Sequence, residues 1–119
     1  MFKYSFEKLD VWQESRCFVQ EIYSITSQFP DSEKYGLINQ IRRAAISISS
    51  NIAEGSSRNT SKDQAHFYIM AYSSCIEIIN QIILAFDLQY INDETYINTR
   101  TKLEKITNQI NALKNSLSR

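Results

Sequence analysis

The fold is decided by the C-terminal stretch, residues 93–117, which reads DETYINTRTKLEKITNQINALKNSL. Its apolar side chains and one threonine recur at alternating spacings of three and four residues. They are Tyr96, Thr99, Leu103, Ile106, Ile110, Leu113 and Leu117. This spacing places them on one narrow stripe of an α-helix, as in a bundle or a coiled coil. Asn92 or Asp93 is expected to cap this helix, with Glu94 in its first turn.

Three earlier segments carry a similar helical period. The second segment follows a three-four spacing through Ile38, Ile41, Ala45, Ile48 and Ile52. The third is apolar over more than half of its circumference, as expected of a central helix or of one that contacts another subunit. The length of each segment, together with its period, favours helix over strand. The expected helices span about residues 8–28, 32–54, 61–89 and 93–117.

The boundaries between these segments are marked by a few residues. Pro30 cannot continue a helix, and Asp31 or Ser32 is expected to cap the second one. Gly55 suits the left-handed backbone position that follows a helix C-terminus. The predicted connections are therefore short.

Thr60 or Ser61 is expected to cap the third helix, because Asp63 and Gln64 follow in its first turn. Short connections make successive helices antiparallel neighbours. The predicted fold is an all-α, up-down-up-down antiparallel four-helix bundle, formed as a single domain by residues 1–119.

Composition excludes several other classes of protein. The 119 residues include only two glycines and one proline, too few for the turns of an all-β fold. The longest apolar-looking stretch, residues 75–86, contains polar residues and is shorter than the roughly 18 apolar residues of a membrane span. The first residues lack the apolar region of a signal peptide. We therefore expect a cytoplasmic protein without a membrane segment.

Residues with catalytic or ligating chemistry are few. His66 is the only histidine and has no partner at metal-ligand spacing. Cys17 and Cys75 lie among apolar residues and are expected to be buried structural thiols. Trp12 and Phe67 are expected in the core. We predict no enzymatic activity, no cofactor and no metal.

The polar residues that stand out belong to one candidate surface. It consists of Arg42, Arg43, Asn51, Glu54, Arg58, Lys62 and Glu77. Glu77 interrupts an apolar helix, so it is expected to be paired with Arg16, Arg42 or Arg43. The same residues allow two interpretations: an ion-pair network between helices or subunits, or an RNA-binding surface in which arginine and lysine contact phosphates. The net charge is zero, but residues 33–62 carry +3 and residues 63–94 carry −5.

Several motifs together resemble one protein family. The residues are FEKLDVWQ at 6–13, QIRRAA at 40–45 and SNIAEG at 50–55, with Lys62, Asp63 and Phe67 continuing the match. Ser74 and Glu77 fit its third-helix motif, although Ser73 stands where the family has glycine. The chain is similar to the four-helix-bundle proteins encoded by intervening sequences of bacterial 23S ribosomal RNA genes.

The resemblance implies a homopentamer without established catalytic activity. The family is related to the accessory variability protein of diversity-generating retroelements, a similar pentamer that engages a reverse transcriptase and nucleic acid. Two functions follow as expectations. The first is an oligomer that contacts RNA or a nucleic-acid-processing protein. The alternative is a purely structural scaffold or protein-interaction module without nucleic-acid binding.

Overall fold

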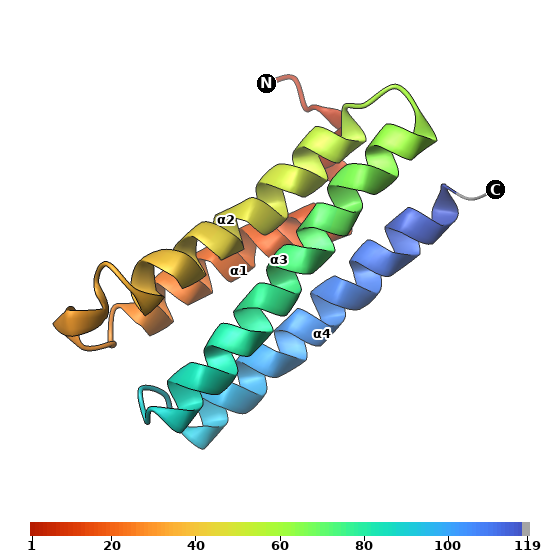
Figure 1. The fold of residues 1–119 in the computed structure, drawn as a ribbon. Coiled ribbons are helices and arrows are strands. Elements are labelled where there is room, and N and C mark those ends of the chain that lie inside the picture. The colour runs from red at the N-terminus through yellow and green to blue at the C-terminus, as the bar shows by residue number, and fades with distance from the viewer. Residues whose placement is uncertain (118–119) are drawn as a thin grey trace.

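The computed structural model describes residues 1–117, and these residues form helices and no strand. The α-helices are α1 (Asp10–Thr26), α2 (Leu37–Ser56), α3 (Ser61–Asp87) and α4 (Asp93–Ser116). Two short 3-10 helices, η1 (Ser5–Lys8) and η2 (Asp31–Glu33), precede α1 and α2. The predicted all-α class with four helices is thus confirmed, and Figure 1 shows the chain reversing its direction at each connection.

The neighbours of each helix follow from its contacts. α1 packs on α2, α2 on α3, α3 on α4, and α4 on α1. Within residues 1–117, no Cα atom of α1 lies within 8 Å of one in α3, and the same holds for α2 and α4. α1 and α3 therefore lie on opposite sides of the molecule, as do α2 and α4 (Figure 1).

The core is built from the predicted stripes. Ile41, Ala45, Ile48 and Ile52 of α2 are fully buried, and so is Leu103 of α4. Side chains from all four α-helices join one hydrophobic cluster. The predicted seams of the second and fourth helices are confirmed at these positions. Burial of such side chains is the main favourable term in folding.

The expected core positions of Trp12 and Phe67 are wrong, since both side chains are only half-buried. Trp12 lies at the edge of the core, where it makes an edge-to-face contact with Phe6 at 4.9 Å between ring centroids. Phe67 carries the guanidinium of Arg58 on its ring. Both rings thus combine apolar contact with a surface position.

The start of the second helix differs from the prediction. α2 begins at Leu37 rather than near residue 32, because Asp31–Glu33 form the separate 3-10 helix η2. Neither Asp31 nor Ser32 caps α2. The Glu33 carboxylate instead accepts a hydrogen bond from the Leu37 N–H at 3.3 Å and another from the Tyr90 hydroxyl at 2.9 Å. The other two predicted caps are confirmed, with Thr60 accepting from the Asp63 N–H and Asn92 from the Thr95 N–H.

Gly55 does not terminate a helix in the left-handed conformation. It lies inside α2, its φ is not positive, and it is buried. A Cβ atom at this position would lie 2.7 Å from Cε1 of Tyr68 and 3.0 Å from Cβ of Phe67. The glycine is therefore needed for the close approach of α2 and α3. Its low helix propensity lowers the stability of α2 relative to alanine at the same position.

Candidate functional site

The structure divides the seven predicted surface residues among three places. Arg42 lies between α1 and α2, and Arg43 and Glu77 line a groove between α2 and α3. Arg58 and Lys62 lie near the α2–α3 connection, at the far end of α2. Arg43 lies thirteen positions before the end of α2 at Ser56, which corresponds to about 20 Å along the helix. The seven residues therefore do not form one compact site.

Arg42 ties α2 to the last turn of α1. Its Nε donates to Thr26 Oγ1 at 2.9 Å, and its terminal nitrogen donates to the Tyr23 carbonyl at 3.3 Å. Its guanidinium carbon lies 4.4 Å from the centroid of the Tyr23 ring. The Tyr23 carbonyl also accepts from the Ser27 N–H at 3.1 Å, so Arg42 adds a second hydrogen bond there, and a cation near a helix C-terminus interacts favourably with the helix dipole. Arg42 is thus held in place by α1 and does not pair with Glu77.

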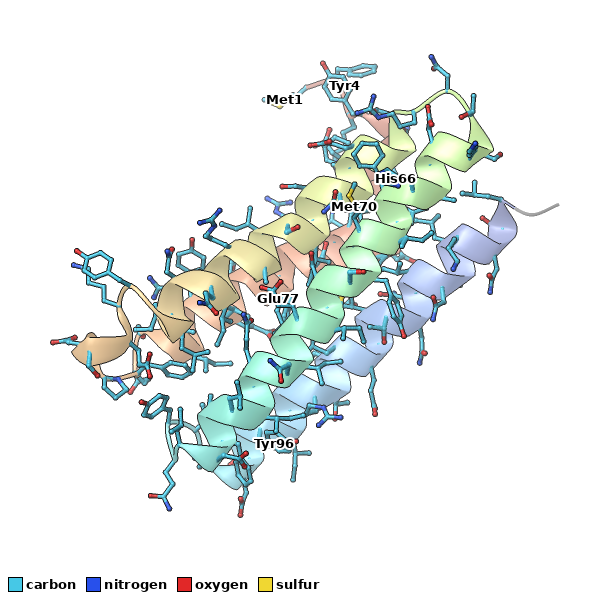
Figure 2. All side chains as sticks on the ribbon, viewed as in Figure 1. Met1, Tyr4, His66, Met70, Glu77 and Tyr96 are labelled. Carbon is cyan, nitrogen blue, oxygen red and sulfur yellow. The ribbon has the colours of Figure 1, made fainter. Side chains whose placement is uncertain are left out.

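The groove between α2 and α3 has a volume of about 360 Å³ and holds both charges. It is lined by Asn39, Gln40, Arg43, Ala44, Ser47, Ser74 and Glu77. Within one chain the expected pairing of Glu77 is not present: its side chain is exposed, and within residues 1–117 it forms no ion pair with Arg16, Arg42 or Arg43. Its pairing with an arginine of another subunit stays a prediction. Its Oε2 instead accepts from Gln81 Nε2 at 3.2 Å, one turn along the same helix. Figure 2 shows Glu77 in the space between α2 and α3.

Beside the groove, a short chain of hydrogen bonds fixes how α2 and α3 align. Ser74 Oγ donates to Ser47 Oγ at 2.9 Å. Asn51 Nδ2 donates to the Ser47 carbonyl at 2.9 Å and to Ser47 Oγ at 3.0 Å. Asn51 therefore serves the helix contact rather than an outer surface. Small residues at this contact allow the two helices to approach.

At the α2–α3 connection, Arg58 stacks on an aromatic ring. Its guanidinium carbon lies 4.5 Å from the centroid of Phe67, and its ion pair with Glu54 is a long 4.0 Å contact between exposed side chains. Lys62 is exposed in the first turn of α3. Exposed contacts of this kind contribute little to stability, so both cations are available to an anionic partner.

The groups with shifted pKa values lie outside these three places. Burial raises the pKa of the Cys75 thiol to about 12. Burial also raises the pKa of Tyr68, and the hydrogen bond to Glu33 raises that of Tyr90. The expected burial of both thiols holds for Cys75 and is wrong for Cys17, which is exposed on α1. Residues 1–117 contain no group of three or more His, Cys, Asp or Glu arranged to hold a metal ion.

One outer surface of α3 is apolar and uncovered. Ile69, Ile76 and Leu84 are 49%, 47% and 45% exposed. The sequence indicated this surface through the apolar circumference of the third segment. Among residues 1–117, α3 alone is long and apolar enough to cross a membrane by length and composition, a test that core helices also pass. The expectation that no segment approaches such a length is therefore too strong for α3.

Two further exposed side chains, which the sequence did not indicate as part of a site, lie on α1 and α2. Tyr23 of α1 and Ile46 of α2 are 40% and 43% exposed. They were missed because each falls beside a predicted buried stripe rather than on it. The only signal was that Ile46 is an isoleucine outside the three-four spacing of its helix.

These features define a four-helix protein with polar helix contacts and an uncovered apolar surface on α3. The model of the 23S rRNA-intervening sequence protein family matches residues 7–112, and the chain belongs to this family. The resemblance seen in the sequence is thus confirmed. No function is established for the family.

Among solved structures, the chain is similar to a protein of unknown function from the S23 ribosomal protein family of Bacteroides thetaiotaomicron. The TM-score is 0.79 at 20% sequence identity, and the match covers 87% of this chain and 97% of the other. This likeness supports the fold. No curated protein matches the chain.

Proposed function

We propose that this chain is the non-enzymatic subunit of a homo-oligomer whose assembled surface contacts RNA. The subunit is an up-down-up-down antiparallel four-helix bundle, supported by the chain reversals in Figure 1. The observation that carries the proposal is the uncovered apolar surface of α3, at Ile69, Ile76 and Leu84. Large apolar patches on soluble proteins mark interaction sites. The resemblance favours five subunits, and we place the protein in the cytoplasm without membrane association.

Self-association is tested by native mass spectrometry and light scattering of the purified chain across a range of concentrations. An assembly of several 13.9 kDa chains is expected. A monomer at all concentrations, with the apolar surface of α3 open to solvent, would contradict the proposal.

RNA contact is supported by Arg58 and Lys62. Both are exposed at the α2–α3 connection, and neither has a short ion pair within residues 1–117. Tyr4 and His66 lie at the same end of the molecule (Figure 2). Phosphate contacts made by such cations are released by salt, so RNA affinity should fall as the salt concentration rises.

The test is fluorescence anisotropy of a labelled single-stranded RNA and a labelled hairpin RNA between about 50 and 200 mM salt. Arg58→Ala/Lys62→Ala should reduce the log-log slope for the single strand by about 1.4, since each lost phosphate contact removes about 0.7. Lys102→Ala/Lys105→Ala is the matched control, because these lysines are paired with Glu21 and Glu14. Absence of binding at the lowest salt would leave the alternative, a structural scaffold or protein-interaction module without nucleic acid.

A further inference from the structure

The apolar surface of α3 is a row that runs along the helix. Ile69, Ile76 and Ile83 recur every seven residues, which is two helical turns, and Leu84 lies beside the last of them. From Ile69 to Leu84 the row is about 22 Å long. Between Gln64 and Phe86 the only Asp, Glu, Lys or Arg is Glu77. A row of this length needs a partner that lies lengthwise along α3.

A second surface, formed by α1 and α2, combines apolar and basic groups. It presents the exposed side chains of Tyr23 and Ile46, together with Arg16, Arg42 and Arg43. The segment of α2 before Glu54 contains no carboxylate. On α1, Glu14 and Glu21 point toward α4, where they pair with Lys105 and Lys102. This surface is therefore positively charged.

The two surfaces complement each other in charge. The row of α3 is flanked by Glu77 and, at the end of the helix, by Asp87, with no lysine or arginine between Gln64 and Asp87, and neither carboxylate forms an ion pair within residues 1–117. The two surfaces also face different ways, because α1 and α3 lie on opposite sides of the molecule. Within one chain Arg43 and Glu77 line the same groove without an ion pair, whereas Ile76 and Ile46 both remain exposed, so only a second copy can cover the apolar parts of both surfaces.

The levels of the residues along the molecule also match. The Ser74–Ser47 hydrogen bond shows that these two residues lie at the same height along the bundle axis. The contact of Gly55 with Tyr68 shows that α2 and α3 are antiparallel, so a residue further along α2 is level with one earlier in α3. Counting from the Ser74–Ser47 bond, Ile76 is level with Ala45, next to Ile46. Glu77 is level with Ala44, next to Arg43. Asp87 lies near the level of Lys34, an exposed base before α2.

We propose that the apolar row of α3 in one copy packs lengthwise against the α1/α2 surface of the next copy, with both copies pointing in the same direction. Ile76 then meets Ile46 of the next copy, and Glu77 meets its Arg42 and Arg43. Different surfaces of identical chains give a head-to-tail contact, which generates a ring when the rotation closes. The pairing rests on the proposed self-association and specifies which surfaces form it.

The experiment uses two variants of the full chain that each lose one surface. Ile76→Asp disables the row and Ile46→Asp disables the α1/α2 surface, and both positions are half-exposed, so the fold is retained. Each variant alone should be monomeric, with association weakened at least about 30-fold, as for central interface residues. Mixed together, they should form a 1:1 complex that stops at two chains, because one intact row meets one intact surface.

Ile97→Asp is the matched control, because Ile97 is an isoleucine of α4, 60% exposed and outside both surfaces. It should assemble like the wild type. Native mass spectrometry reads every outcome, and formation of the mixed complex shows that both variants are folded. If Ile46→Asp assembles like the wild type, the proposed pairing is overturned and an α3-to-α3 contact becomes the explanation. If both variants are folded but do not combine, the pairing is overturned as well. A monomeric wild type would instead overturn self-association itself.

Discussion

α3 and α4 are adjacent helices of similar length, but they differ in how much of their surface is apolar. α4 buries one seam, with Thr99, Leu103, Ile106 and Ile110, and leaves Ile97 as its exposed isoleucine. α3 buries a comparable seam and also exposes an apolar row on its outer side. A helix with one apolar seam serves one core. In α3 the second apolar row lies outside the core of its own chain, so the two rows should respond differently to mutation.

The largest effect is expected in the buried seams of both helices. Ile78→Ala in α3 and Leu103→Ala in α4 remove side chains that are fully buried. Each should lower the free energy of unfolding by about 2–5 kcal/mol, through lost burial and the cavity left behind. Urea denaturation measures this change. Ile76→Ala on the outer row is the contrasting variant, since it should weaken assembly while leaving the unfolding of dissociated chains within about 0.5 kcal/mol.

Gly55→Ala should have the next largest effect on stability, because it disturbs the close contact between α2 and α3 at Tyr68. The new methyl group would lie 2.7 Å from the Tyr68 ring, and overpacking of this kind costs about 1–3 kcal/mol. The gain in helix propensity from alanine, about 1 kcal/mol, offsets part of that cost. Thermal unfolding followed by circular dichroism checks the balance. A variant more stable than wild type would show that Tyr68 moves aside freely.

Cys75 should make stability fall at high pH. Burial raises the pKa of its thiol from 9.0 to about 12, so above pH 9 the unfolded chain loses a proton that the folded chain keeps. The folded state therefore loses stability between pH 9 and 12, by at most about 1.4 kcal/mol per pH unit. The urea midpoint of the wild type should therefore fall more steeply with pH over this range than the midpoint of Cys75→Ala. Parallel slopes would exclude the thiol as the cause.

The smallest effects are expected at the helix N-termini. Thr60→Ala removes the cap of α3 and Asn92→Ala that of α4, and each should cost about 1 kcal/mol. Glycine at the same positions should cost only a few tenths of a kcal/mol relative to the natural caps. Equal losses for alanine and glycine would mean that the lost side-chain hydrogen bond alone sets the cost, whereas no loss for either would mean that this hydrogen bond contributes little.

The sequence was informative where local chemistry determines structure. The spacing of Ile41, Ala45, Ile48 and Ile52 predicted a buried stripe, and Thr60 and Asn92 predicted helix starts. Gly55 was misassigned because its role depends on Tyr68, thirteen residues away, which no local pattern indicates. α2 began late because Glu33, inside a 3-10 helix, supplies the hydrogen bond expected from Asp31 or Ser32.

The candidate site was predicted as a set of residues and not as a geometry. Arg42 and Arg43 were correctly placed in the second helix and Glu77 in the third, but pairing depends on which way each long side chain turns. Arg42 turns to α1 and Glu77 to Gln81. Helical periodicity gives the face of a residue, whereas the partner of a flexible charged side chain is set by tertiary contacts.

The ion pairs between α1 and α4 make one side of the molecule sensitive to ionic strength. Lys105 and Lys102 bridge to Glu14 and Glu21 with exposed side chains, whereas α1–α2 and α2–α3 are joined by part-buried hydrogen bonds of Arg42 and Ser74. Salt screens the exposed pairs most. Local opening should therefore begin where α4 leaves α1, and amide hydrogen exchange in α4 should accelerate with salt before that of α2.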